Sequence, residues 1–170
     1  MSTLLPLFVP NATWHDGPCA EVRVGDHVIR YLRRGTGPSI VVVSDAGDSH
    51  PMWRRLIESL APSHRIFLTE PPPAGVDMAS WLRGFIEGIG LASIILIAGG
   101  TTGPAAMEVA AVDDFTVRKL ILLPVDGTSA SSEYDAWPPD APGNFLALTA
   151  GSADESLSRI ERFIATDDAA

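Results

Sequence analysis

The sequence predicts a three-layer α/β fold, in which a mostly parallel sheet of about seven strands has helices on both faces. Continuous β-branched runs such as Ser39–Ser44 (SIVVVS) are typical of strands that are buried on both faces of such a sheet. Segments with apolar residues at helical spacing alternate with these runs. An antiparallel hairpin comes first, because Gly25–Asp26 separates two short alternating segments.

The hairpin strands are Glu21–Val24 and His27–Arg33, and Gly35–Pro38 forms the turn before Ser39–Ser44. Ser44–His50 is expected to be the loop that follows this strand, before the first helix.

That helix is predicted over Met52–Leu60, and the strand Arg65–Glu70 follows it. Three prolines in series at Pro71–Pro73 exclude both a helix and a central strand, so a loop is expected there. Asp77–Gly88 is the second helix, because its apolar residues form a single stripe.

The second half of the chain repeats the alternation. Ser93–Ala98 is predicted as a strand and Pro104–Ala111 as a helix, in whose first turn proline costs no hydrogen bond. Lys119–Val125 and Asn144–Ala150 are the last two strands, and Asp154–Ile164 is the closing helix.

Length and composition indicate one globular domain over residues 21–165, preceded by an apolar arm (1–20) and followed by a flexible tail (166–170). The arm lacks a basic segment and contains prolines, which argues against a signal peptide. No apolar run reaches the length of a membrane span, so no membrane partner is expected.

The net charge and the cysteine content limit which binding partners and which cellular compartment are expected. The net charge is −9, and no Lys/Arg cluster resembles a nucleic-acid footprint, so nucleic acid is not an expected partner. Cys19 is the only cysteine, which excludes an intrachain disulfide and fits a reducing cytoplasm. It is interpreted as a small buried hydrophobe, with an acyl acceptor as the alternative.

The segment Ile94–Gly103 (IILIAGGTTG) runs from a buried strand into a glycine-rich turn and then into a helix of small residues. This is the shape of a nucleophile elbow, whose usual form is G-x-S-x-G. Here the turn contains no serine. The sequence therefore predicts the frame of a hydrolytic site without its usual nucleophile.

From Val22 to Ile164 the chain resembles an α/β-hydrolase of the ester- and epoxide-hydrolase type. The order and spacing of several segments carry this resemblance, rather than any one motif. They are the hairpin Gly25–Tyr31, the third strand with its oxyanion loop Val41–Trp53, the fourth strand with its loop Arg65–Gly75, the sixth strand Val117–Leu123, and the turn Gly151–Asp154.

The elbow allows two registers. The glycine pattern places Thr101 at the nucleophile position, whereas the downstream segment with Glu108 places Gly100 there. A β-branched residue rarely adopts the left-handed backbone that this position requires, and glycine adopts it freely, so steric reasoning favours Gly100.

Other departures from the resembled family affect the rest of the site. Ser44–Asp45 replaces the usual His-Gly, and a carboxylate there would oppose an oxyanion. Glu70 replaces an aspartate, and only the loop Asp126–Pro142 stands where the family has a cap domain. The eighth strand, and the catalytic histidine that follows it, have no counterpart in this sequence.

The candidate catalytic residues are His50, Thr101 and Asp154. His50 is the best candidate base, although a solvated residue at a helix start is the alternative; Asp154 is either an acid or the cap of the last helix. Backbone and side-chain groups at the strand ends are the candidate substrate-binding residues: Ser44, Asp45, Ala46, Glu70, Gly100, Thr102 and Asp126. Trp53 and Trp137 are core or rim residues that could line an apolar pocket.

Two classes of function follow. The first is an atypical enzyme for an acyl or apolar small molecule, with acyl transfer from a carrier-protein thioester as a candidate reaction in bacterial specialised metabolism. The second is a non-catalytic pseudo-hydrolase that binds a ligand or a partner. No cofactor or metal is expected, because the carboxylates show no ligand spacing. A homodimer is expected, because the seventh strand would otherwise be an uncovered sheet edge; the apolar N-terminal arm is the alternative cover for this strand.

Overall fold

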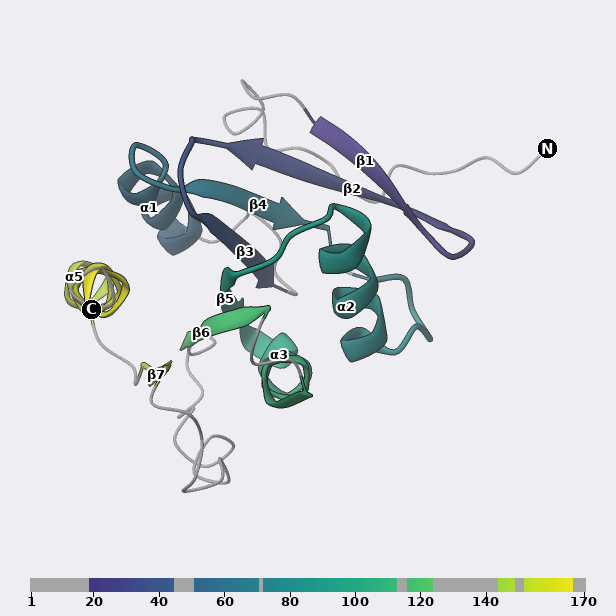
Figure 1. Ribbon diagram of the computed structural model, residues 1–170. Coiled ribbons are helices and arrows are strands. Elements are labelled where there is room, and N and C mark those ends of the chain that lie inside the picture. The colour runs from purple at the N-terminus through teal and green to yellow at the C-terminus, as the bar shows by residue number, and fades with distance from the viewer. Residues whose placement is uncertain are drawn as a thin grey trace.

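Seven strands form one sheet in the computed structural model, in the order β1-β2-β4-β3-β5-β6-β7 (Figure 1). The structure describes residues 19–44, 51–70, 72–112, 116–123, 144–148 and 152–166. The strands are β1 (Cys19–Val24), β2 (His27–Arg34), β3 (Ser39–Ser44), β4 (Arg65–Thr69), β5 (Ile94–Gly99), β6 (Val117–Leu123) and β7 (Phe145–Ala147). The helices are α1 (Pro51–Leu60), α2 (Met78–Gly88), the 3₁₀ turn η1 (Gly100–Thr102), α3 (Gly103–Val112) and α5 (Ala153–Ala165). The predicted α/β architecture is confirmed.

The sheet is antiparallel at one side and parallel elsewhere. β1 pairs antiparallel with β2, with Val24 opposite His27, as the Gly25–Asp26 turn predicts. β2 pairs antiparallel with β4, and β4, β3, β5, β6 and β7 are parallel to one another. The carboxyl ends of the parallel strands therefore meet at one edge of the sheet, which we call the carboxyl edge; the opposite one is the amino edge.

Element boundaries differ from the prediction mainly at the two edge strands. β1 begins at Cys19, so the last two residues of the predicted arm belong to the sheet. β7 covers only Phe145–Ala147, whereas the sequence predicts Asn144–Ala150. β7 has a single neighbour in the sheet, and short edge strands are common for that reason. Residues 1–18 and 167–170 lie outside the described residues, so the division into arm, domain and tail stays a prediction.

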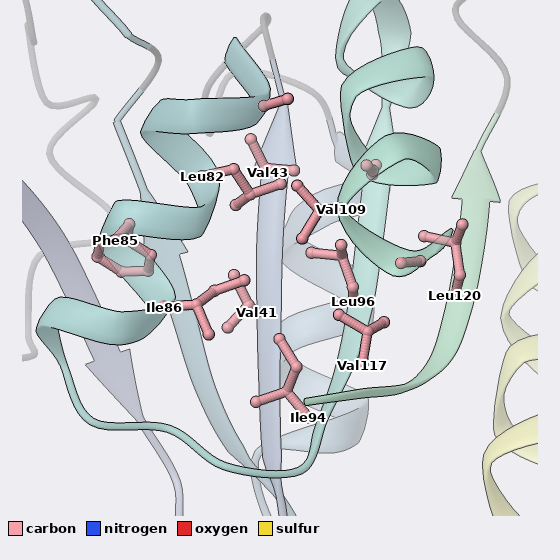
Figure 2. Packing of buried hydrophobic residues seen from close by; sticks show 14 of the residues in the cluster. Val41, Val43, Leu82, Phe85, Ile86, Ile94, Leu96, Val109, Val117 and Leu120 are labelled. Atoms are coloured by element: carbon pink, nitrogen blue, oxygen red, sulfur yellow. The ribbon is translucent and has the colours of Figure 1, made fainter. Parts of the chain in front are cut away.

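The core consists of two layers because alternate side chains of a strand point to opposite faces of the sheet. On one face, Val41 and Val43 of β3 pack under α2 and α3, and Figure 2 shows them beside Ile86 and Leu82 of α2. On the other face, the intervening residues of β3 pack against α1 and α5. A strand covered on both faces is apolar at every position, which explains the continuous run in the sequence.

α2 is fixed at both ends by local hydrogen bonds. The carboxylate of Asp77 accepts a hydrogen bond from the backbone N–H of Ser80, 2.9 Å away. Hydrogen bonds with Ser80 hold the pKa of Asp77 below its usual value of 3.8. Gly90, with φ +70°, ends the helix, and the N–H of Leu91 donates to the carbonyl of Ile86. This is the Schellman arrangement expected after a helix.

Two glycines of α2 let the edge strand β1 approach closely. A Cβ atom at Gly84 would lie 2.4 Å from Cγ1 of Val24, and one at Gly88 would lie 2.9 Å from Cγ2 of Val22. The valine side chains therefore occupy the space that larger helix residues would fill. This contact covers the inner face of β1 and holds the hairpin on the domain.

The helices are short. The longest, α5, has 13 residues, and it packs its apolar stripe against α1 and the sheet. Within the described ranges, no helix has the length and apolar character that crossing a membrane requires.

Candidate functional site

Three neighbouring strands bring their ends together at the carboxyl edge. Ser44, the last residue of β3, lies opposite Gly99, the last residue of β5, and Gly99 lies opposite Leu123 of β6. Ligands of open α/β sheets bind beyond this edge. Ser44 is only 2% exposed, so it lies in the floor of any site above the strands.

The backbone takes the register that steric reasoning favours at the elbow. Gly99 is extended, with φ −133°, and Gly100 is left-handed, with φ +72°. Among the described residues other than glycine, only Ser93 has a positive φ, so Thr101 is not left-handed. A strand turns into a helix here within a few residues, which requires one left-handed position, and glycine fills it without strain. Gly100 thus stands at the tip of the elbow.

The elbow rests on a tryptophan. A Cβ atom at Gly99 would lie 2.4 Å from Cζ2 of Trp53, in α1. The indole is 4% exposed and belongs to the core cluster with α1 and α5. Trp53 is therefore a core residue, as one of its two predicted roles requires, and it packs directly against the elbow.

The two threonines of the elbow have different surroundings. Thr102 is fully buried, and its hydroxyl lies 2.8 Å from the carbonyl oxygen of Gly99 and 3.2 Å from that of Val43. The hydroxyl therefore links the ends of β3 and β5, and it supports the elbow rather than reaching a ligand. Thr101, in contrast, is exposed and is held between these buried neighbours.

Glu70 continues the pairing between β4 and β2. Its carboxylate accepts a hydrogen bond from the backbone N–H of Arg30, 3.0 Å away, and its own N–H donates to the carbonyl of Arg30. β4 lies between β2 and β3 in the sheet, so this contact faces away from β3. The structure thus gives Glu70 a structural partner, and its predicted role in substrate binding stays a prediction.

Asp154 lies in the first turn of α5 and pairs with α1. Its carboxylate lies 2.6 Å from Nη1 of Arg55, and its side chain is 85% exposed. The alternative interpretation of Asp154 as a helix cap is wrong, because the hydroxyl of Ser152 accepts the hydrogen bond from the N–H of Glu155. α1 and α5 cover the sheet face opposite α3. No contact between Asp154 and the elbow is found among the described residues.

Four predicted site residues, Asp45, Ala46, His50 and Asp126, lie outside the described residues, as does Trp137. The structure brings together Ser44, Gly100, Thr101 and Thr102, and it gives Glu70 and Asp154 partners elsewhere. Groups of three or more His, Cys, Asp or Glu side chains with a metal-site arrangement do not occur in the part of the chain that the structure describes.

Sequence reasoning missed a buried lysine. Lys119 of β6 is 3% exposed, and its ammonium lies 2.6 Å from the carbonyl oxygen of Phe163 and 2.9 Å from that of Ile164. It also lies 5.0 Å from the centre of the Phe163 ring. A cation at a helix C-terminus is stabilised by the last carbonyls and by the helix dipole. The only signal in the sequence is a lysine directly before the apolar run Leu120–Leu123.

Comparison with known proteins shows the fold. Neither a family model nor a curated protein sequence matches the chain. Solved structures do match it. A bacterial membrane phospholipase A described as a virulence factor gives a TM-score of 0.57 at 22% identity, over 67% of this chain and 42% of its own. A protein assigned as a lipase from Acinetobacter baumannii AYE gives a TM-score of 0.56 at 16% identity, over 87% of this chain and 60% of its own.

An epoxide hydrolase named CorEH gives a TM-score of 0.54 at 20% identity, over 73% of this chain and 47% of its own. The chain thus spans between 42% and 60% of the lengths of these three proteins. The three matches cover between 67% and 87% of this chain, and all three proteins are hydrolases by name. The chain therefore has the α/β-hydrolase fold.

Proposed function

We propose that the protein binds an acyl or other apolar small molecule at the carboxyl edge and forms no covalent intermediate at the elbow tip. The observation that carries this proposal is the left-handed Gly100. Serine hydrolases of this fold place their nucleophile on the strained turn between strand and helix. Glycine has no side chain there, and the neighbouring hydroxyl of Thr102 is buried between two carbonyl oxygens.

The class of ligand is supported by the position of the site and by the structural neighbours. The carboxyl edge is where open α/β sheets bind ligands. Proteins that share the fold are named as a phospholipase A, a lipase and an epoxide hydrolase. By analogy with these names, we propose a lipid-like or otherwise apolar ligand for this chain.

Binding and covalent reaction are separated by one pair of measurements. Isothermal titration with N-alkyl amides of increasing chain length should give saturable binding, because an amide keeps the acyl carbonyl but resists hydrolysis. Incubation with p-nitrophenyl esters and acyl thioesters, followed by intact mass measurement, should show no acyl adduct. An adduct on the parent protein that Thr101→Val abolishes would contradict the proposal.

The second candidate is acyl transfer without a serine nucleophile, with a thioester, including one on a carrier protein, as donor in bacterial specialised metabolism. The exposed position of Thr101 next to Gly100 favours it. In this proposal His50 handles the proton. Turnover of a thioester by the parent protein, lost in Thr101→Val and in His50→Gln, would support it. Thr36→Val, which makes the same change at an exposed threonine in the turn before β3, is the control. Turnover that survives both site variants would contradict it.

We further propose a homodimer in which β7 of one copy is covered by the other. β7 is the last strand of the sheet, and its three residues are half-buried. Uncovered strand edges are usually protected in native proteins. Light scattering after size exclusion measures the mass directly, and a monomer at all concentrations would contradict this proposal.

A further inference from the structure

Two arginines lie side by side on one face of the sheet, at its amino edge. Arg33 of β2 is opposite Phe67 of β4, and Arg65 is two residues before Phe67 on the same strand. Side chains of a strand alternate between faces, so Arg33, Arg65 and Phe67 share one face. Diagonal neighbours of this kind have Cα atoms roughly 7–8 Å apart, which long side chains easily span.

The two like charges are exposed and have no ion-pair partner among the described residues. Two other exposed arginines do form ion pairs: Arg30 with Glu21 at 3.2 Å and Arg55 with Asp154 at 2.6 Å. The chain as a whole carries a net charge of −9, so acidic side chains are abundant. Like charges on neighbouring strands repel each other, and an anion between them would convert this repulsion into attraction.

The backbone that carries the arginines is held firmly. Gly35 and Gly37 are left-handed, with φ +82° and φ +118°, and the turn they form lies against the segment before β4. A Cβ atom at Gly35 would lie 2.1 Å from the carbonyl oxygen of His64, and one at Gly37 would lie 2.3 Å from that of Ser63. The N–H of Arg65 also donates to the carbonyl of Pro38, at 2.8 Å. The backbone positions of both arginines are thus fixed relative to each other, so binding orders only their side chains.

We propose that Arg33 and Arg65 together bind the phosphate group of a small molecule. A guanidinium offers parallel N–H donors that match two phosphate oxygens, and a phosphate dianion has enough acceptors for two such groups. The site lies at the amino edge of the sheet, away from the elbow, so it does not depend on the function proposed above. The adjacent Arg34 belongs to the opposite face, because it follows the alternation of Leu32, which packs in the other core layer.

The experiment measures binding of inorganic pyrophosphate by isothermal titration at low ionic strength. Arg33→Gln and Arg65→Gln should each weaken binding about tenfold or more, because each removes a charge-assisted pair of hydrogen bonds. Arg34→Gln is the matched control: it removes the same charge one residue away, on the other face of the sheet. All three side chains are exposed, and thermal unfolding by circular dichroism checks that the variants fold.

Saturable binding that Arg33→Gln and Arg65→Gln weaken and Arg34→Gln preserves would support the site. Co-sedimentation with phosphatidic acid vesicles, against phosphatidylcholine vesicles, then distinguishes a lipid headgroup from a soluble phosphate as the source. The absence of saturable binding, or an equal loss of affinity in all three variants, would overturn the proposal. Either result would mean that the arginines contribute only nonspecific surface charge. Binding of a poly-glutamate peptide in place of pyrophosphate would also overturn it, in favour of an acidic protein partner.

Discussion

Gly99 occupies a position where the structure leaves no room for a side chain. In Gly99→Ala the new Cβ atom would lie 2.4 Å from Cζ2 and 3.0 Å from Cη2 of Trp53. Carbon atoms in contact are normally about 3.5–4.0 Å apart, so roughly 1 Å of displacement must be absorbed. The indole is 4% exposed, and the backbone of β5 is paired on both sides, so neither partner moves freely.

The expected cost follows from these contacts. Overpacking a core by one methyl group typically destabilises by about 1–3 kcal/mol. Alanine also lowers the conformational entropy of the unfolded chain, which stabilises the folded state by about 0.4–1 kcal/mol. We therefore expect Gly99→Ala to lower the free energy of unfolding by about 1–2 kcal/mol, with a drop in Tm of about 2–8 °C for a chain of this length.

A double-mutant cycle isolates the contact. Phenylalanine lacks Cζ2 and Cη2, so in Trp53→Phe the added methyl group meets no ring atom, and Gly99→Ala should then cost at least about 1 kcal/mol less. Urea unfolding followed by far-UV circular dichroism measures each corner of the cycle. Gly84→Ala is the control: its Cβ also comes within 2.4 Å of a neighbour, but that neighbour is the side chain of Val24 on an edge strand. A cost of Gly99→Ala under about 0.5 kcal/mol, or strictly additive effects, would refute the reasoning.

Four further predictions concern single positions. Gly100→Ala should destabilise by about 1–2 kcal/mol in urea unfolding, since alanine disfavours a left-handed backbone; an unchanged midpoint would contradict the assigned conformation. Thr102→Val should destabilise by about 1–3 kcal/mol, because two buried carbonyl oxygens lose a donor; thermal unfolding measures it. Lys119→Met should destabilise by a similar amount and increase amide exchange at the end of α5, which loses its capping ammonium. The pKa of Asp77 is held below 3.8, so its ionised form stabilises the fold above that pH and progressively less below it; Asp77→Asn should flatten the acid limb of stability below pH 3.8.

Local sequence features predicted much of the fold. The turn at Gly25–Asp26 fixed the register of the hairpin, with Val24 opposite His27. The apolar stripe predicted for the second helix is buried in the structure, where it includes Leu82, Phe85 and Ile86. The left-handed position at Gly100 followed from steric preference alone. Each of these depends on a few consecutive residues, and such short-range constraints are visible in one sequence.

The contacts that the sequence did not predict join segments far apart in the chain. An aspartate at the position of Asp154 can be a helix cap or a catalytic acid. Its partner in the structure, Arg55, lies 99 residues away in the sequence. Glu70 bonds to a strand 40 residues before it, and Lys119 reaches the end of a helix more than 40 residues after it. A charged residue is compatible with many partners, and only the packing of the elements selects one. The roles of charged residues were therefore the least predictable part of the candidate site.

The elbow illustrates why a conserved shape does not by itself indicate a conserved reaction. Gly99 gives room to Trp53, Gly100 supplies the left-handed turn, and Thr102 ties the end of β5 to that of β3. All three stabilise the junction of strand and helix, and none of them requires a substrate. A domain that lost the nucleophile would still need this junction in order to fold, because β5 lies in the middle of the sheet and α3 covers it. Stability alone is thus sufficient to account for the elbow, and a test for chemistry has to use other residues, among them the exposed Thr101 of the turn.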